Sequence, residues 1–153
     1  MTARPLVPLL ALALACGPRL LPGTDIRDDE DTRAIASMLE TYRQAMEKRD
    51  AQAVLELVAP DYFDSSGAAE IADDVDRDGL ARRLAELSKV SALHLQLTLR
   101  RVDVKDGVGQ AEVLFDQYYR VTTPNGPVAR HDTDVHRMTL KKLNGAWKFT
   151  SGL

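Results

Sequence analysis

The sequence predicts an α+β fold in which three N-terminal helices pack on a strongly curved, four-stranded antiparallel sheet. Two observations support this fold class. Up to about residue 90 the apolar residues recur every three or four positions, as on a helix with one buried face. From Ser91 onward apolar and polar residues alternate, as in strands with one buried face, and Asp-Gly and Asn-Gly pairs separate the alternating segments. Helices followed by an antiparallel meander form a two-layer α+β domain.

Length and composition indicate a single globular domain. The chain has 153 residues, of which 44% are hydrophobic and 28% charged. The net charge is −3, and lysine and arginine are scattered among acidic residues, so no nucleic-acid partner is expected. The single cysteine, Cys16, excludes an intrachain disulfide and a zinc site of paired cysteines. We expect no metal site and no cofactor.

The N-terminus predicts export. An apolar run follows Arg4 and ends at Cys16, which indicates a signal peptide over residues 1–15. The pattern resembles a bacterial lipoprotein signal, in which the cysteine is lipidated and becomes N-terminal. Ordinary cleavage, which would leave Cys16 as a free thiol, and an uncleaved start are the alternatives. We therefore expect a protein lipid-anchored to the bacterial cell envelope, at the periplasmic face or the outer membrane, and otherwise secreted. The anchor would be its only contact with a membrane.

Residues 16–30 are rich in proline, glycine and aspartate, and predict the lipidated cysteine followed by a flexible tether. The folded domain is expected over residues 31–153. Its first helix should be capped by Asp31 or Thr32 and should run to about Arg49. The helix has one apolar stripe of residues spaced as neighbouring turns require. These residues are Ile35, Met38, Leu39, Tyr42 and Met46.

Two shorter helices are expected next. Asp50 should cap the second, which Pro60 ends, and a short extended segment over residues 61–64 follows. Asp78-Gly79 should open the third, with Leu80 and Leu84 facing inward. The preceding residues imitate the first half of a calcium loop, but Ala85 stands where a bidentate carboxylate is required, so an acidic helix N-terminus is expected instead.

The strands can be placed in register from their turns. Asp106-Gly107 should join the first two strands, and a bulge at Arg100-Arg101 is needed to keep their apolar residues on one face. A turn over residues 124–127 leads to a third strand over residues 132–143. The Asn144-Gly145 turn then sets Leu140 opposite Phe149, so that both share the buried face with Met138, and further along with His136 and Asp134.

This pattern resembles the nuclear transport factor 2-like superfamily, also called SnoaL-like or cystatin-like cone, and specifically a bacterial lipoprotein form of it. The resemblance implies a cone-shaped α+β barrel, a wide range of unrelated activities, and dimerisation through the outer sheet face at Leu114, Tyr118, Val135 and Thr139. It is carried by the helix pair over residues 42–50, the segment 59–64, Gly67, Gly79-Leu80 and the closing strand over residues 145–149.

Ketosteroid isomerases of this superfamily use an oxyanion-donating tyrosine, an aspartate base and a protonated aspartate. The resemblance places Tyr42 at the first position and Asp134 near the third. The base position falls near Ser66, which cannot abstract a proton from carbon at neutral pH, and Asp64 would need a register change to serve. The isomerase mechanism is therefore not transferred to this chain.

Four residues are candidates for catalysis: Tyr42, Asp64, Asp134 and His136. Tyr42 could instead be a core tyrosine, and His136 with Asp134 could lie at a solvated strand end. A ligand pocket is expected to be lined by Tyr42, Tyr62, Phe115, Gln117, Tyr119 and His136.

The first functional hypothesis is a non-catalytic module that binds a small apolar ligand or dimerises. The alternative is an isomerase, dehydratase or cyclase. It requires His136 and a carboxylate to converge in a cavity, and a cone filled by Met38, Phe115, Met138 and Phe149 would remove that site.

Overall fold

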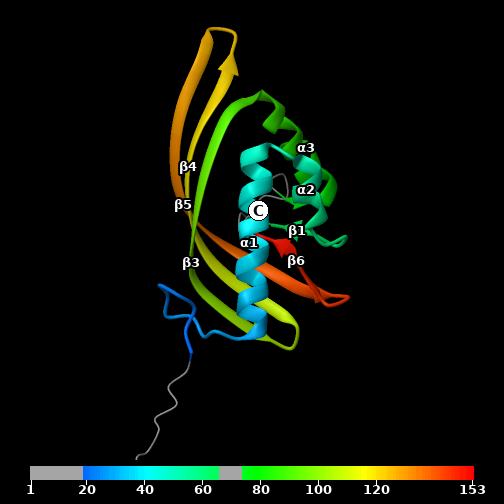
Figure 1. Cartoon of the computed structure of the whole chain (residues 1–153). Helices are drawn as coiled ribbons and strands as arrows, with labels where there is room; N and C mark the ends of the chain where they lie inside the picture. Colours follow the sequence, from blue (N-terminus) through cyan, green and yellow to red (C-terminus); the bar gives the residue numbers. More distant parts are fainter. Residues whose placement is uncertain (1–18, 66–73) are drawn as a thin grey trace, which may run out of the picture.

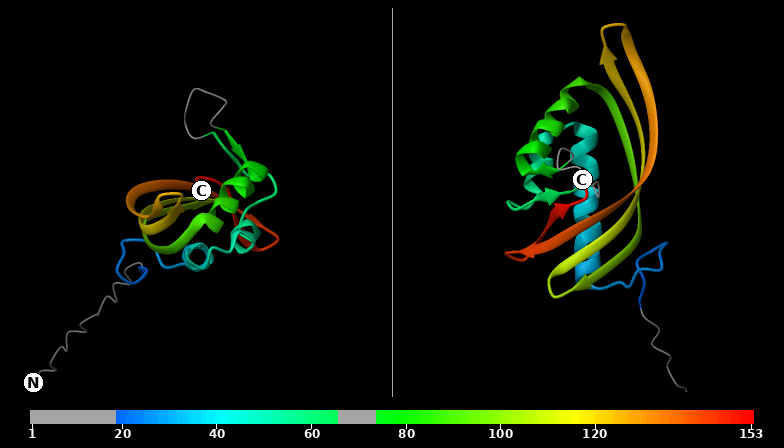
Figure 2. Two further views of the ribbon diagram at one scale, coloured as in Figure 1. Left: turned by 90° about the horizontal axis from the view of Figure 1, so that it is seen from above. Right: turned by 180° about the vertical axis from the view of Figure 1, so that it is seen from behind.

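The computed structural model describes residues 19–65 and 74–153. One long helix, α1, lies across the concave face of a curved antiparallel sheet, with the shorter helices beside it (Figures 1 and 2). The sheet order is β3-β4-β5-β6, so the predicted α+β class and the four-stranded meander are confirmed. The elements are α1 (Glu30–Lys48), α2 (Ala51–Glu56), β1 (Phe63–Asp64), β2 (Val75–Asp76), α3 (Arg77–Ala85), the 3-10 helix η2 (Glu86–Lys89), β3 (Val90–Lys105), β4 (Val108–Thr123), β5 (Gly126–Leu143) and β6 (Ala146–Ser151).

The helices begin at acidic caps. The Asp29 carboxylate accepts a hydrogen bond from the Thr32 amide (2.9 Å), and the Thr32 hydroxyl accepts one from the Asp29 amide (3.0 Å). The predicted cap at Asp31 or Thr32 was wrong because this acidic run holds several residues able to cap, and only Asp29 has a reciprocal partner at the right spacing. Asp50 caps α2 as predicted, and Asp76 caps α3 through the Gly79 amide (2.7 Å).

Residues 19–29, directly before α1, fold back on themselves. Leu20 and Arg27 form an isolated antiparallel bridge, and the Leu21 amide donates to the Ile26 carbonyl (2.8 Å). The Ile26 side chain is 6% exposed. Part of the predicted tether therefore packs as a small loop against the domain. The predicted signal peptide and Cys16 lie outside the described residues, and among the described helices none is long and apolar enough to cross a membrane.

The sheet follows the predicted register closely. β3 and β4 pair with a register shift between Leu99 and Arg101, which confirms the predicted bulge, and a second shift lies near Val90. Leu140 pairs with Phe149, also as predicted. β5 begins at Gly126 and not at residue 132, because residues 126–131 extend the β4 hairpin even though they lack a clear apolar alternation.

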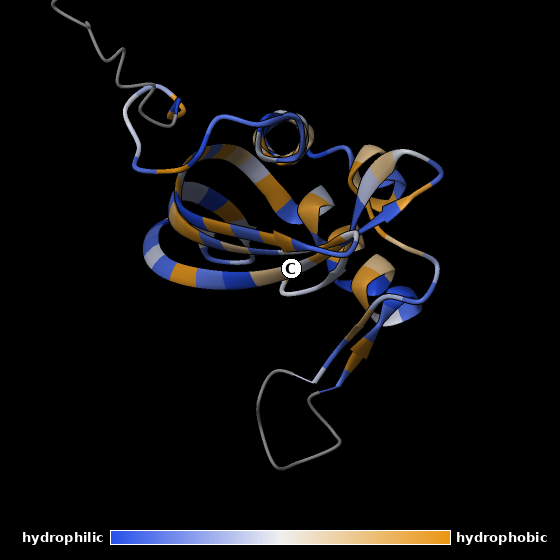
Figure 3. Cartoon of the chain, turned by 90° about the horizontal axis from the view of Figure 1, so that it is seen from below, coloured by the Kyte–Doolittle hydropathy of each residue, from blue (hydrophilic) through white to orange (hydrophobic). Residues whose placement is uncertain are grey.

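The core lies between α1 and the concave sheet face. Apolar residues alternate with polar ones along the strands that enclose it (Figure 3). Ile35 and Val54 from the helices and Val113, Leu140 and Phe149 from the strands have no exposed surface. Burying such side chains is the main favourable contribution to folding, about 1.5–3 kcal/mol each.

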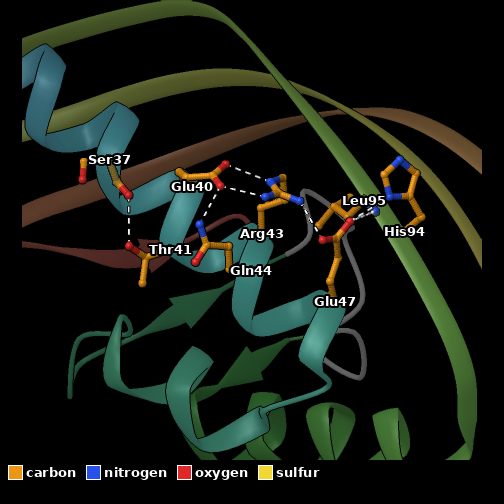
Figure 4. Close-up of polar contacts among 8 residues, drawn as sticks. All are labelled: Ser37, Glu40, Thr41, Arg43, Gln44, Glu47, His94 and Leu95. Carbon is orange, nitrogen blue, oxygen red and sulfur yellow. Dashed lines mark hydrogen bonds and ion pairs between the residues drawn. The ribbon is translucent and has the colours of Figure 1, made fainter.

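The C-terminal half of α1 covers the free edge of β3 (Figure 4). One carboxylate oxygen of Glu47 accepts the edge-facing amide of Leu95 (3.0 Å), and the other binds Arg43 (2.7 Å). The Arg49 guanidinium donates to the carbonyls of Val90 (2.8 Å) and Ser91 (3.1 Å). Unpaired strand edges otherwise recruit other strands, so these contacts protect β3. The Leu95 amide, followed by Arg43, holds the pKa of Glu47 below its usual value.

Candidate functional site

Tyr42 lies in the core. Its side chain is 6% exposed and meets Phe115 and Phe149 edge-on, with ring centroids 6.1 Å and 5.7 Å away. Burial, and to a lesser extent the neighbouring Tyr62, raises the pKa of the Tyr42 phenol above its usual value. The hydroxyl therefore stays protonated at neutral pH. A buried phenol among aromatic rings fits the core role that the helical stripe also predicted.

Three polar residues meet at residues 152–153, directly after β6. Tyr62 precedes β1, Asp64 ends β1, and His136 lies on β5. The Asp64 carboxylate accepts the Gly152 amide (2.9 Å), and His136 Nδ1 lies 3.3 Å from the Gly152 carbonyl oxygen. The Tyr62 hydroxyl accepts the Leu153 amide (3.1 Å) and donates to the Leu153 carbonyl (3.3 Å). Two of the four acid–base candidates, Asp64 and His136, therefore converge, but on the chain's own backbone at Gly152.

Gly152 is shaped for this contact. Its φ of +92° is rarely adopted by other residues, and a Cβ there would lie 2.3 Å from the Arg137 carbonyl oxygen and 2.8 Å from the Met138 Cα. The absence of a side chain lets residue 152 lie flat on the β5 backbone. Sequence reasoning did not assign a role to Gly152 or Leu153. The one signal was a glycine directly after the last strand.

Asp134 lies apart from this group. It is exposed on the inward-facing side of β5, and its carboxylate accepts the amide of Val135 (2.7 Å). Asp132 on the same side accepts the Tyr119 hydroxyl (2.8 Å). His136 stacks on Phe115 with ring centroids 4.1 Å apart. Asp134 and His136 share a face, as predicted, but each makes separate contacts.

The expected pocket residues divide into two sets. Tyr42, Tyr62 and Phe115 are buried, whereas Gln117, Tyr119 and His136 are half-buried. The narrow part of the cone is filled by a cluster of buried side chains. These include Met38, Phe115, Met138 and Phe149. Beyond Phe115 the concave-side residues Gln117 and Tyr119 of β4 are half-buried, and the end of the β4–β5 hairpin extends beyond the helices (Figure 1).

The acidic segment before α3 is used for capping. Asp76 accepts the Gly79 amide at 2.7 Å, which is the acidic helix N-terminus predicted from the sequence. Within residues 19–65 and 74–153 no three histidine, cysteine, aspartate or glutamate side chains gather as metal ligands would.

Solved structures share this architecture. A conserved protein from Planctomyces limnophilus DSM 3776 matches at TM-score 0.66 and 14% identity, over 79% of this chain and 91% of that one. A proposed dehydratase of the NTF2-like (nuclear transport factor 2-like) family from Streptomyces avermitilis matches at TM-score 0.64 and 15% identity, over 81% and 94%. The chain has the nuclear transport factor 2-like fold.

A proposed aromatic ring hydroxylase from Novosphingobium aromaticivorans shares this fold, at TM-score 0.67 and 17% identity over 80% of this chain and 85% of that one. No protein-family model and no curated protein matches the sequence. At these identities the likeness extends to the nuclear transport factor 2-like fold alone, since this fold carries many unrelated activities.

Proposed function

We propose that this protein is a non-catalytic binding module of the bacterial cell envelope, which holds a small apolar ligand on the open part of its concave sheet face. One observation carries the proposal. Asp64 and His136, the groups best suited to acid–base chemistry, are both hydrogen-bonded to Gly152. The half-buried side chains beyond Phe115 can contact a ligand through their shape and polarity, and such binding requires no proton transfer.

The ligand chemistry follows from the residues on that face. Leu93 and Leu97 of β3 lie beside Tyr119 and Phe115 of β4 and supply apolar area. Gln117 carries an amide that can donate and accept hydrogen bonds. Ligand sites of this kind combine an apolar lining with a few polar groups that fix orientation. The expected ligand is therefore a small, flat, mainly apolar molecule with one or two hydrogen-bonding groups.

An isomerase, dehydratase or cyclase is the second candidate, and one observation favours it. Asp64 and His136 contact the same residue, Gly152, at 2.9 Å and 3.3 Å, so a movement of that residue would leave a carboxylate and an imidazole facing one space. Catalysis would then require displacement of residues 152–153. Binding on the open face requires no such movement.

Two adjacent tyrosines provide a matched test. Tyr119 faces the concave side, whereas Tyr118 is 50% exposed on the outer side and stacks on His131. Fluorescence titration of the full chain with N-phenyl-1-naphthylamine, a neutral apolar probe, should give about tenfold weaker binding for Tyr119→Ala. Tyr118→Ala should bind as the wild type does. Equal loss in both variants, or no loss in either, would refute this binding site.

The envelope location rests on Cys16. Mass spectrometry of the mature N-terminus should show a lipidated cysteine as the first residue, and Cys16→Ala should abolish both lipidation and membrane attachment. An unmodified Cys16 would contradict the anchor.

A homodimer through the outer sheet face uses one of two alternative interfaces for a second copy of the chain, and the other, at the edge of β5, is argued below. Tyr118 and Val135 are exposed there, beside half-buried Leu114 and Thr139. Light scattering on the full chain in detergent should give the mass of a dimer for the wild type. If the outer sheet face is the interface, Tyr118→Ala shifts that mass toward the monomer, and if the edge of β5 is the interface, the mass is unchanged.

A further inference from the structure

β5 has a free edge along most of its length. It pairs with β4 from Gly126 to Lys141, but β6 pairs only with residues 139–143. Residues 127–135 are all exposed, and the β4–β5 hairpin that contains them extends beyond the helices (Figures 1 and 2). Within the described ranges 19–65 and 74–153, no backbone group of another segment pairs with this edge.

Whether a residue of β5 has an odd or an even number decides whether its backbone amide and carbonyl point to the free edge or to β4. The Lys142 amide donates to the Gly107 carbonyl (2.9 Å), so even-numbered residues of β5 direct their amides toward β4. Because backbone groups alternate along a strand, odd-numbered residues direct theirs to the free edge. Ala129, His131 and Thr133 therefore present amides and carbonyls there.

The edge-facing amides of Ala129, His131 and Thr133 are bounded on each side by a residue with no free amide. Pro127 has no amide hydrogen. The Val135 amide is already bonded to the Asp134 carboxylate (2.7 Å). The opposite edge of the sheet, on β3, is covered by Glu47 and Arg49. The chain therefore protects the β3 edge of the sheet and leaves on the β5 edge a short unpaired window, residues 129–133.

We propose that this window pairs antiparallel with the same window of a second copy of the chain, across a two-fold axis at His131. In this register Ala129 lies opposite Thr133 of the second copy, and His131 lies opposite its own equivalent. The three pairs exchange six backbone hydrogen bonds and join the two sheets. Pro127 falls opposite Val135 of the second copy, so the two positions without a free amide face each other and no ladder donor is lost.

Charge selects this register over its neighbours. Arg130 and Asp132 are exposed on the concave side of the edge, and with the axis at His131 each Arg130 lies opposite Asp132 of the second copy. Moving the axis to Asp132 would set two aspartates against each other while each Arg130 faced Asp134 of the second copy, and moving it to Arg130 would set two arginines against each other. Opposite charges facing across strands stabilise the pairing, and like charges destabilise it. Of these three registers, only the one centred on His131 brings opposite charges together without setting like charges against each other.

Charge reversal tests the register directly. Arg130→Asp alone or Asp132→Arg alone places like charges opposite each other twice per dimer, whereas the double variant Arg130→Asp/Asp132→Arg restores both attractive pairs. Sedimentation equilibrium of the full chain in density-matched detergent should show a wild-type dimer and, in each single variant, a dissociation constant raised about tenfold or more. The double variant should return to within about threefold of the wild type. Mixing the two single variants should also restore dimers.

A backbone substitution tests the ladder. Thr133→Pro removes one edge-facing amide and leaves the bonds to β4 in place, so it should weaken the dimer, whereas Thr133→Ala keeps the amide and should not. Circular dichroism checks that each variant is folded. A wild-type chain that is monomeric at every concentration would overturn the proposal. So would a dimer that survives both single reversals and is lost in Tyr118→Ala, which would place the interface on the outer sheet face.

Discussion

Replacing Gly152 by alanine should release the segment that engages the acid–base candidates. The added Cβ would lie 2.3 Å from the Arg137 carbonyl oxygen, which belongs to the backbone of β5 and is fixed by the pairing of that strand with β4. Residues 152–153 must then leave β5, which breaks the hydrogen bonds to Tyr62, Asp64 and His136. At about 1 kcal/mol for each of four bonds, with a further ~1 kcal/mol for half-buried Leu153, the loss is about 5 kcal/mol.

Gly145 supplies the control. Its φ is +82°, but a Cβ there would meet nothing within 4 Å, so Gly145→Ala should cost only the backbone strain of about 1–2 kcal/mol. Urea unfolding of the full chain, followed by circular dichroism, measures both variants. If Gly152→Ala is no less stable than Gly145→Ala, the hydrogen bonds at Tyr62, Asp64 and His136 do not hold the segment, and the reasoning is refuted.

Three further predictions concern stability. The pKa of Glu47 is lower in the folded chain than in the unfolded chain, so ionised Glu47 stabilises the fold above the unfolded pKa of ~4.3, and this stabilisation is lost as pH falls through the folded pKa. When urea unfolding is measured from about pH 7 into this acid range, the free energy of unfolding should fall less for Glu47→Gln than for the wild type. Asp76→Ala removes the N-cap of α3 and should lower the free energy of unfolding by about 1 kcal/mol, measured with urea. Asp78→Ala, in the first turn of the same helix, should lower it by less. Phe149→Ala empties a fully buried site and should cost about 3–5 kcal/mol, and a loss below ~1 kcal/mol would contradict the packing.

The sequence was most informative where local chemistry decides the structure. The Asp106-Gly107 and Asn144-Gly145 turns set the strand register by themselves. In β3 the apolar residues have odd numbers up to Leu99 and even numbers from Val102 on, so a bulge between them was required to keep one face apolar. The cap of α1 was harder to place, because Asp29 is distinguished from its acidic neighbours only by its reciprocal bond with Thr32.

The site could be predicted only in part. Alternation put His136 and Asp134 on the inward face, but which group each contacts depends on where β6 ends and how residues 152–153 turn back on β5. That turn depends on a non-local contact between Gly152 and the β5 backbone, which no sequence spacing encodes. The ligand itself leaves no local signature, since an open apolar sheet face suits many molecules.

A crystal structure of the full chain with N-phenyl-1-naphthylamine bound tests the central claim most directly. The binding-module account predicts the probe on the open concave face against Leu97, Tyr119 and His136, with the bond from the Gly152 amide to Asp64 intact. A probe that occupies the space of residues 152–153, between Asp64 and His136, would contradict the account and favour an acid–base site.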